Sequence, residues 1–336
     1  MKHARRTSTW HACGLVAVVL MAVSGSGCSR RDAGEKGQAQ RSGDGQGTAE
    51  TWPRDGSKDR PLVVMLIPSE TGSKSVLDDY KPLFDAVSRV HGIHFDLKMG
   101  DSYNAVIEGM VAEHIDIAFF GPVTFDEARR RGAATLLAVE QTDGASVYFA
   151  GIYHRTGSGM TSLADLRGKS LALGDPKSTS SFRYPVAMLV AAGIDPVADL
   201  GKIVMAGSHT AALEELEAGH VDAAAASLNA FDKSVESGAI DSQKIALLAR
   251  SEAIPSPPLA MHSKLPADLQ ARLRNAFNTI HQADGVTAEM LLGYGGKKVD
   301  RYNAGVDVAI FDQAMQKLAR VTDELASEII DKAGQP

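Results

Sequence analysis

The chain has 336 residues, of which 44% are hydrophobic and 23% are charged. This composition is typical of a globular protein, and the length suffices for two ordinary domains or one large one. The formal net charge is -6 and no long basic run occurs, which argues against nucleic acid as a partner. A negative total does not exclude an anionic ligand, because local dipoles decide what binds inside a cleft.

Residues 1–28 have the pattern of a secretory signal peptide. Basic residues precede a short apolar core at 12–23, which is too short for a transmembrane helix. The end resembles a bacterial lipobox, in which Cys28 would be lipidated and become the mature N-terminus. Gly27 fits that pattern, whereas Gly25 stands where leucine is usual. We therefore expect a periplasmic or extracytoplasmic protein held at the membrane through a lipid anchor only, with soluble release as the alternative.

The mature body lacks the residues for thiol chemistry. Cys13 lies in the segment that would be removed, and Cys28 is the other cysteine of the sequence. This excludes disulfides, thiol catalysis and cysteine-based metal sites in the folded part. Residues 29–60 are rich in Gly, Ser, Gln, Arg and Asp and contain no Leu, Ile, Val or Phe. Such a segment cannot offset its ordering entropy by burial, so it is predicted to be a flexible tether.

From residue 61 onwards, strand-like runs alternate with helical spacing. Strands are predicted at 62–67, 94–98, 115–120 and 135–139, and helices through 80–90, 103–112 and 125–128. This alternation predicts a parallel sheet covered on both faces. A β-like run at 145–153 follows, with Val147, Phe149 and Ile152 assigned to one face.

A second α/β series follows and resembles the first. Strands are predicted at 171–173, 203–205, 221–225 and 244–248, and helices at 180–192, 211–218 and 230–236. The pattern His114-Ile115-Asp116 recurs as His220-Val221-Asp222 before an apolar strand, which indicates two similar lobes. Residues 61–150 with 253–336 would form lobe 1, and 151–252 lobe 2. The helices predicted from 266 to 330 are placed on lobe 1, so the chain would cross between the lobes twice.

Hydroxyl residues gather at one strand-to-helix turn, at 178–181 within Asp-Pro-Lys-Ser-Thr-Ser-Ser-Phe. The first N–H groups of a helix have no intrahelical partner, and the helix dipole is positive there. Together with the hydroxyls, these donors suit a tetrahedral oxyanion. Ordinary N-capping by Ser or Thr is the alternative explanation.

Several segments in this order resemble the phosphate/phosphite/phosphonate substrate-binding family of ABC transporters, which has the type II periplasmic binding protein fold. The matching segments are 101–110, 115–122, 175–180, 206–212 and the loop at 254–255. The resemblance covers roughly residues 61–290. It implies an α/β fold of two lobes with the ligand cleft between them, closing like a hinge.

The resemblance also implies ligand-binding residues. In the family a Ser-Thr-Ser turn grips the phosphonate oxygens, which corresponds to Ser178, Thr179 and Ser180. A family histidine that donates to the same oxygens corresponds to His209, which precedes a predicted helix; a capping or surface histidine is the alternative.

Aromatic residues and an acid complete the predicted site. Tyr103 and Tyr148 match family tyrosines that line the cleft, although an aromatic in such a place is often core. Relatives that carry 2-aminoethylphosphonate place carboxylates near its ammonium, but the matching stretches 224–228 and 256–258 contain no acid. Glu70, in the first loop, is the one acid that could lie near the cleft, and a solvated loop glutamate is the favoured alternative. This favours phosphate, phosphite or a small alkylphosphonate.

The implied partners are a small-molecule oxyanion and an ABC permease with its ATPase. A sensor that signals to a histidine kinase remains an alternative, and a hydrolase is a further one. Motifs of nucleophile elbows, zinc proteases and P-loops are absent from the sequence. His91 and His94 flank Gly92 and are not expected to bind metal. We expect a monomeric binding protein rather than an enzyme, with no cofactor and no metal.

Overall fold

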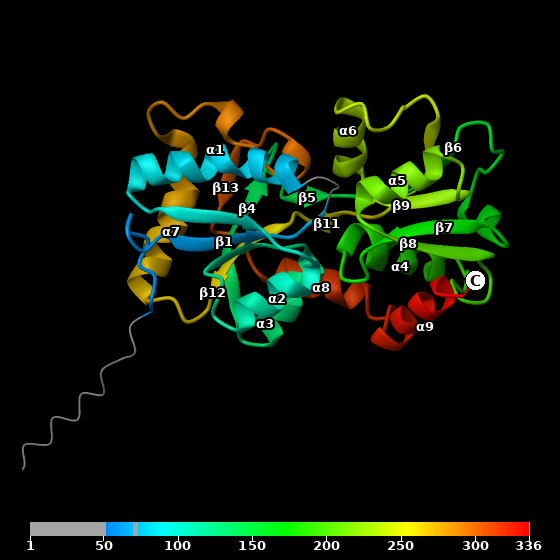
Figure 1. Ribbon diagram of the computed structural model, residues 1–336, viewed down its shortest axis with the longest axis horizontal. Coiled ribbons are helices and arrows are strands. Elements are labelled where there is room, and N and C mark those ends of the chain that lie inside the picture. Colours follow the sequence, from blue (N-terminus) through cyan, green and yellow to red (C-terminus); the bar gives the residue numbers. More distant parts are fainter. Residues whose placement is uncertain (1–51, 70–72, 336) are drawn as a thin grey trace, which may run out of the picture. The chain divides into compact units, whose positions relative to one another are not determined.

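The computed structural model of the protein describes residues 52–69 and 73–335, which all belong to one compact unit of the chain. In these residues the strands form a six-stranded sheet, a five-stranded sheet and a two-stranded ribbon (Figure 1). Helices cover both faces of the two large sheets. The α/β class predicted from the sequence is therefore confirmed. We call the six-stranded sheet with its helices lobe 1 and the five-stranded sheet with its helices lobe 2.

The strands of each sheet are as follows. Lobe 1 has the order β13-β4-β12-β3-β1-β2, with β1 (Leu62–Leu66), β2 (Phe95–Met99), β3 (Ile117–Phe119), β4 (Ala134–Gln141), β12 (Pro258–His262) and β13 (Arg301–Asn303). Lobe 2 has the order β10-β6-β9-β7-β8, with β6 (Ala150–Arg155), β7 (Ser170–Gly174), β8 (Lys202–Gly207), β9 (Ala223–Ser227) and β10 (Ile245–Arg250). The ribbon pairs β5 (Val147–Tyr148) with β11 (Ile254–Pro255).

Both sheets are mixed rather than purely parallel. In lobe 1, β1 is parallel to β2 and β3, with Val64 opposite Leu97 and Ile117. In lobe 2, β7 is parallel to β8 and β9. The strands β12 and β6 run antiparallel to their neighbours. Each of them follows a strand of the ribbon directly, at the point where the chain arrives from the other lobe. The strand therefore enters its sheet from the side of the ribbon, which explains its reversed direction.

The helices divide between the two lobes. Lobe 1 carries α1 (Ser73–His91), α2 (Tyr103–Val111), α3 (Pro122–Arg130), α7 (Ala267–Thr279) and α8 (Ala309–Lys317), and lobe 2 carries α4 (Tyr184–Ala191), α5 (His209–Glu217), α6 (Leu228–Glu236) and α9 (Asp323–Ala333). In Figure 1, α1 lies on one side of the first sheet, and α2 and α3 lie on the other. The rings of Phe84 on α1 and Phe277 on α7 meet edge to face at 5.4 Å.

The last helix differs from the prediction. Its residues Ala326 and Ile329 are buried in the same cluster as Leu171 of β7, so α9 packs on lobe 2 and not on lobe 1. An amphipathic pattern tells that a helix has an apolar face but not which sheet will cover it. The chain therefore passes between the lobes a third time, between α8 and α9 (Figure 1).

The β-like run at 145–153 breaks at Phe149 into β5 and β6. Val147 has an exposed fraction of 47%, whereas Tyr148 has 3% and Ile152 is fully buried, so placing Val147 on the same face as Ile152 was wrong. Because β5 pairs with β11 while β6 pairs with β9 and β10, the alternation of faces does not continue through the break.

The segment predicted as a tether included residues 52–60, and these residues contact lobe 1. Trp52 Nε1 donates a hydrogen bond of 2.6 Å to Asp116 Oδ1, and Arg54 forms an ion pair with Oδ2 of the same carboxylate. The Trp52 ring lies 4.7 Å from the ring of His262. Among the described residues, no helix is long and apolar enough to cross a membrane. The apolar stretch at 12–23 and Cys28 lie outside them.

Candidate functional site

A small cavity lies between the lobes, at the carboxyl ends of the parallel strands. Ligands of α/β proteins usually bind at this end of the strands. The cavity has a volume of about 10 Å³, and it is lined by Ile67, Ser69, Tyr103, Phe119, Gly121, Tyr148, Ser178, Thr179, Ser180, His209, Pro257 and Tyr294. The predicted residues Ser178, Thr179, Ser180, His209, Tyr103 and Tyr148 are thus all brought together here.

The hydroxyl-rich turn is a single π-helical turn, Thr179–Arg183, which leads into α4. The sequence predicted an ordinary helix from residue 180. Pro185 has no N–H to donate to the carbonyl four residues earlier, so the α-helical pattern is interrupted there. The wider turn is closed instead by the Arg183 N–H, which donates to the Ser178 carbonyl at 3.0 Å. Single π-turns are often found at functional sites.

The hydroxyls of this turn are held in fixed directions. Ser178 Oγ accepts hydrogen bonds from the N–H of Ser181 at 3.2 Å and from its hydroxyl at 2.8 Å. Since both bonds use Ser178 Oγ as acceptor, its own hydrogen is left to point elsewhere. Thr179 Oγ1 accepts from the N–H of Val123 in lobe 1 at 3.0 Å. Gly121 permits this approach, because a Cβ there would lie 3.2 Å from Thr179 Oγ1.

His209 is buried and electrically neutral. Burial lowers the pKa of His209 to about 3. Its Nδ1 accepts a 2.9 Å hydrogen bond from the N–H of Ser227, so the neutral ring carries its proton on Nε2. His209 therefore presents a neutral N–H donor to its surroundings, and its own backbone N–H donates to the Ser69 carbonyl of lobe 1 at 3.2 Å.

The tyrosines come from lobe 1 and from the ribbon. Tyr103 is the first residue of α2, and Tyr148 lies in β5; both are 3% exposed. Burial raises the pKa of the Tyr148 hydroxyl, against the opposing effect of hydrogen bonds with Ser180 and Thr179. Tyr148 thus stays protonated and touches the hydroxyl-rich turn of lobe 2.

The sequence analysis missed two polar residues of the cavity, Tyr294 and Ser69. The Tyr294 hydroxyl lies 2.9 Å from Ser227 Oγ and 3.2 Å from His209 Nε2. Ser69 is 2% exposed, and its hydroxyl has no hydrogen-bond partner among the described residues. The sequence did contain a signal at Tyr294. The glycines around it, at 293, 295 and 296, argue against the helix that was predicted there.

The electrostatics of the cavity come from neutral groups. Within the part of the chain that the structure describes, no Lys, Arg, Asp or Glu lines it. The helices α2, α3 and α5 begin at lining residues or directly after them, as does the turn before α4. Their N-terminal dipoles favour negative charge. The site can therefore bind an anion through hydroxyl and N–H donors without a salt bridge.

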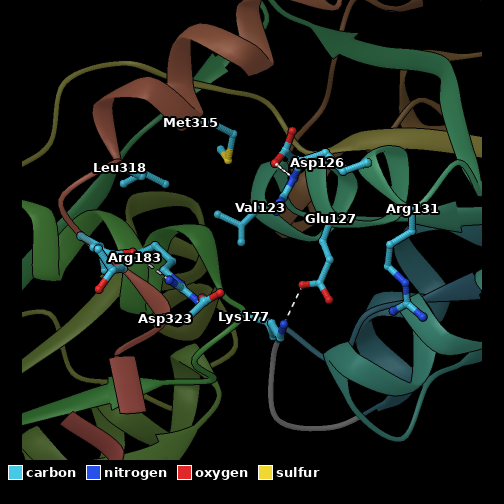
Figure 2. A pocket seen from close by; sticks show the side chains of 12 residues that line it. Val123, Asp126, Glu127, Arg131, Lys177, Arg183, Met315, Leu318 and Asp323 are labelled. Carbon is cyan, nitrogen blue, oxygen red and sulfur yellow. Dashed lines mark hydrogen bonds and ion pairs between the residues drawn. The ribbon is translucent and has the colours of Figure 1, made fainter. Parts of the chain in front are cut away.

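A larger groove of about 610 Å³ is lined by Lys177 and Arg183, which flank the turn, and by residues of α3 (Figure 2). Its charged side chains compensate one another. Lys177 of lobe 2 pairs with Glu127 of lobe 1 at 2.6 Å, and Arg130 pairs with Asp126 at 2.8 Å. This internal pairing favours the small cavity as the ligand site. Glu70 and Cys28, also predicted as functional residues, lie outside the described residues.

Two lobes that enclose a cavity at the ends of their strands are typical of periplasmic binding proteins, and neutral donors at helix N-termini suit an oxyanion. The model of one family matches residues 64–300, and it is described as ABC transporter, phosphonate, periplasmic substrate-binding protein. The chain belongs to this family. The resemblance found in the sequence is confirmed. The protein is thus a substrate-binding component that works with an ABC permease and its ATPase.

Relatives and solved structures agree with this assignment. The chain is 27% identical over 241 residues to the phosphate-import protein PhnD of Mycolicibacterium smegmatis, which covers 68% of this chain and 73% of that protein. It is 24% identical over 225 residues to the phosphonates-binding periplasmic protein of Escherichia coli, 66% of each chain. A binding protein component of an ABC phosphonate transporter from Pseudomonas aeruginosa has a TM-score of 0.64 at 19% identity, covering 81% of this chain and 98% of that one.

A further solved structure has the same fold. PhnD1 from Prochlorococcus marinus, in complex with methylphosphonate, has a TM-score of 0.65 at 16% identity and covers 77% of this chain and 97% of that chain. The predicted fold of two lobes with a cleft between them is therefore confirmed.

Proposed function

We propose that the protein binds a small phosphorus oxyanion that has no charged tail, such as phosphate, phosphite or methylphosphonate. Ser178, Thr179, Ser180 and His209 would hold the oxygens, and Tyr103 and Tyr148 would close over them. One observation carries the proposal: among the described residues, the closed cavity is lined by neutral donors and by no carboxylate.

The missing carboxylate bears on the ligand's tail. An ammonium group enclosed in a cavity loses its hydration, which is costly unless an acid meets it. Relatives that carry an aminoalkyl ligand place such acids in two stretches. The corresponding residues here, 224–228 and 256–258, contain no carboxylate. The likeness to a phosphate-import protein supports the same ligand class. Glu70, which directly follows the cavity residue Ser69, is the acid that remains to be tested.

Competition calorimetry tests this proposal on phosphate, phosphite, methylphosphonate, 2-aminoethylphosphonate and sulfate. We expect at least one tail-less phosphorus oxyanion to bind about tenfold or more tightly than 2-aminoethylphosphonate, the ratio for a poorly compensated polar group. Tighter binding of 2-aminoethylphosphonate than of every tail-less ligand would contradict the proposal. In that case Glu70→Gln is the first variant to measure, since it removes the charge and keeps the shape.

We further propose that the mature protein is a monomer anchored through a lipid on Cys28. The support is the signal-like sequence up to that cysteine. Mass spectrometry of the protein extracted from membranes should show a lipid-modified N-terminal cysteine, and Cys28→Ala should release the protein in soluble form. An unmodified Cys28 in wild-type protein would contradict the anchor.

A further inference from the structure

We propose that Tyr294 sets the size limit of the ligand, because its side chain lines the cavity and is held against the start of α6. This inference rests on the proposed function and specifies which side chain excludes larger ligands. It concerns a residue whose hydroxyl touches the ring of His209 and whose ring stands in the cavity wall.

Tyr294 reaches across from one lobe to the other. Its backbone N–H donates to Glu140 Oε2 on β4 of lobe 1 at 2.6 Å. Its hydroxyl lies against lobe 2, 2.9 Å from Ser227 Oγ at the start of α6. Its carbonyl accepts from Asn229 Nδ2 of the same helix at 3.1 Å. The residue is therefore fixed at both its backbone groups and at its hydroxyl.

The ring has little freedom to move aside. Tyr294 is 4% exposed, and its ring meets Tyr148 edge to face at 5.6 Å and lies 6.1 Å from Phe119. The next residue, Gly295, has a φ of +73°, and a Cβ there would lie 3.0 Å from Asn229. This backbone favours glycine and brings the loop close against α6. Displacing the ring would break contacts in both lobes.

The phenol separates the cavity from the start of α6. Ser227 and Asn229 both bond to Tyr294, yet neither belongs to the cavity lining, whereas Tyr294 does. A group on the phosphorus atom that extended towards Ser227 and Asn229 would therefore meet the tyrosine ring, which lines the cavity. A ligand held by the Ser178–Ser180 turn must then be short on that side.

The hydroxyl has a second task that can be tested apart from the ring's volume. In this structure His209 Nε2 carries the proton of the neutral imidazole and donates to the Tyr294 oxygen, and Tyr294 in turn donates to Ser227 Oγ. A bound oxyanion would therefore compete with Tyr294 for the His209 N–H. Tyr294→Phe removes this link and keeps the ring. Tyr294→Ala removes both, and Tyr294→Leu keeps part of the volume.

The experiment measures dissociation constants of the full mature protein for phosphate, methylphosphonate, ethylphosphonate and 2-aminoethylphosphonate by calorimetry. For the wild type we expect ethylphosphonate to bind about tenfold or more weakly than phosphate, since one misfitting carbon unit is worth about that much. Tyr294→Ala should narrow this ratio by about tenfold. Tyr294→Phe should change the affinity for all ligands by a similar factor and leave the ratio unchanged.

The outcomes separate this inference from the proposed function. Failure of the wild type to bind any tail-less oxyanion contradicts the proposed function. Wild type that binds phosphate, but ethylphosphonate equally well, contradicts the size limit and leaves the proposed function standing. An unchanged ratio in a folded Tyr294→Ala or Tyr294→Leu, judged by thermal unfolding, also overturns the inference. Tyr294→Leu, which keeps part of the volume, carries the test if Tyr294→Ala fails to fold.

Discussion

Each lobe has an aspartate, just before a strand of its sheet, that exchanges hydrogen bonds with the backbone of the neighbouring strand. The surroundings of this aspartate differ between the lobes. In lobe 1, Val63 N–H donates to Asp116 Oδ2 at 2.7 Å, and the Asp116 N–H donates back to the Val63 carbonyl at 2.9 Å. In lobe 2, Ser170 and Asp222 exchange the equivalent bonds at 2.9 and 3.2 Å. The repeated His-Ile/Val-Asp pattern of the sequence thus corresponds to one structural element that occurs in each lobe.

The surroundings of the two aspartates differ. The Asp116 side chain is fully buried and is satisfied by Trp52 and Arg54 from the N-terminal segment. Asp222 is partly exposed and is satisfied by the Ser170 hydroxyl beside it at 2.7 Å. The lobes therefore share a scaffold, but lobe 1 depends on a distant part of the chain to complete it.

The same division holds at the cavity. Lobe 2 supplies hydroxyl and imidazole donors at helix starts, namely Ser178, Thr179, Ser180 and His209, whereas lobe 1 supplies mainly aromatic walls, Tyr103, Phe119 and Tyr294. One lobe thus carries the polar contacts and the other covers them. This asymmetry gives a reason for the lobes to close, because the donors of lobe 2 leave water only when lobe 1 covers them.

The largest effect should come from the aspartate of lobe 1. Asp116→Asn removes a fully buried carboxylate charge from the pair with Arg54, whose side chain is 22% exposed, and it places an amide N–H₂ against the donors of Trp52 and Arg54. We expect a loss of about 3–5 kcal/mol in the free energy of unfolding, the range for breaking a buried pair. The matched change Asp222→Asn should cost only about 1 kcal/mol, as for an ordinary hydrogen bond. Urea unfolding measures both, and equal losses would show that the N-terminal segment contributes nothing.

A smaller effect is expected at the ligand, from a hydroxyl of lobe 2. Thr179→Val keeps the shape of the side chain, and it removes the acceptor for Val123 N–H together with a donor to the anion. Affinity should fall by about 1–3 kcal/mol, as for hydrogen bonds to charged groups. Tyr148→Phe removes a hydroxyl of the ribbon, which covers the turn of lobe 2. It should lower the affinity less than Thr179→Val does.

The control for this measurement is Thr124→Val. Thr124 is buried in α3 and donates to the Gly121 carbonyl at 2.9 Å, but it does not line the cavity. It should change stability and leave the affinity measured by calorimetry unchanged. A larger loss for Tyr148→Phe than for Thr179→Val would reverse the assignment of roles to the two lobes.

The parts predicted from the sequence are those with local causes. The Ser178–Ser180 turn and His209 stand at helix starts, where a short stretch of sequence specifies the unpaired N–H groups and the hydroxyls together. Most strands and helices of both lobes were predicted for the same reason, since their periodicity lies within a few residues.

The parts that were missed depend on contacts between distant segments. Tyr294 joins the cavity because its loop is held by Glu140 on β4 and by Asn229 on α6. Nothing within residues 280–308 specifies either partner, and the stretch was read as helical although its glycines argue against this. The position of α9 on lobe 2 and the burial of Asp116 by Trp52 have the same origin. No periodicity signals which surface will be covered.

The buried ionisable groups of the two lobes should give opposite dependences on pH. Burial raises the pKa of Glu140 in lobe 1 from 4.5 to about 7. Folded protein then binds a proton that unfolded protein has lost, so stability falls as pH rises through this window. Burial lowers the pKa of His209 in lobe 2 from 6.5 to about 3. Here the unfolded state binds the proton, so stability falls as pH drops from 6.5 towards 3.

Variants separate the two contributions. Relative to wild type, Glu140→Gln should lose less stability between pH 5 and pH 8, and His209→Gln should lose less on acidification below pH 6. Each difference should be on the order of 1–2 kcal/mol, since one unit of pKa corresponds to about 1.4 kcal/mol. Urea unfolding at a series of pH values measures them. Curves that run parallel to wild type would show that neither group changes its proton on unfolding.

The smallest effect concerns the ion pair that joins the lobes beside the site. Lys177, next to Ser178 in lobe 2, lies 2.6 Å from Glu127 of α3 in lobe 1 (Figure 2). This contact exists only when the lobes are together, so it should favour the closed, ligand-binding form. The side chains are 31% and 22% exposed, and partly exposed pairs contribute about 0.2–1 kcal/mol. Lys177→Ala should therefore weaken ligand binding by about two- to fivefold at low salt.

Two further measurements, at high salt and with both charges reversed, test whether the Lys177–Glu127 pair favours closure of the two lobes. At high salt the effect of Lys177→Ala should shrink, because screening weakens the pair in the wild type as well. Reversing both charges, Lys177→Glu with Glu127→Lys, should restore most of the affinity, whereas each reversal alone should lower it. Lys81→Ala is the control, since its pair with Asp85 at 2.5 Å lies within α1 and joins no lobes. A single reversal that leaves the affinity unchanged, or an equal effect of Lys81→Ala, would mean that the two lobes close without help from this pair.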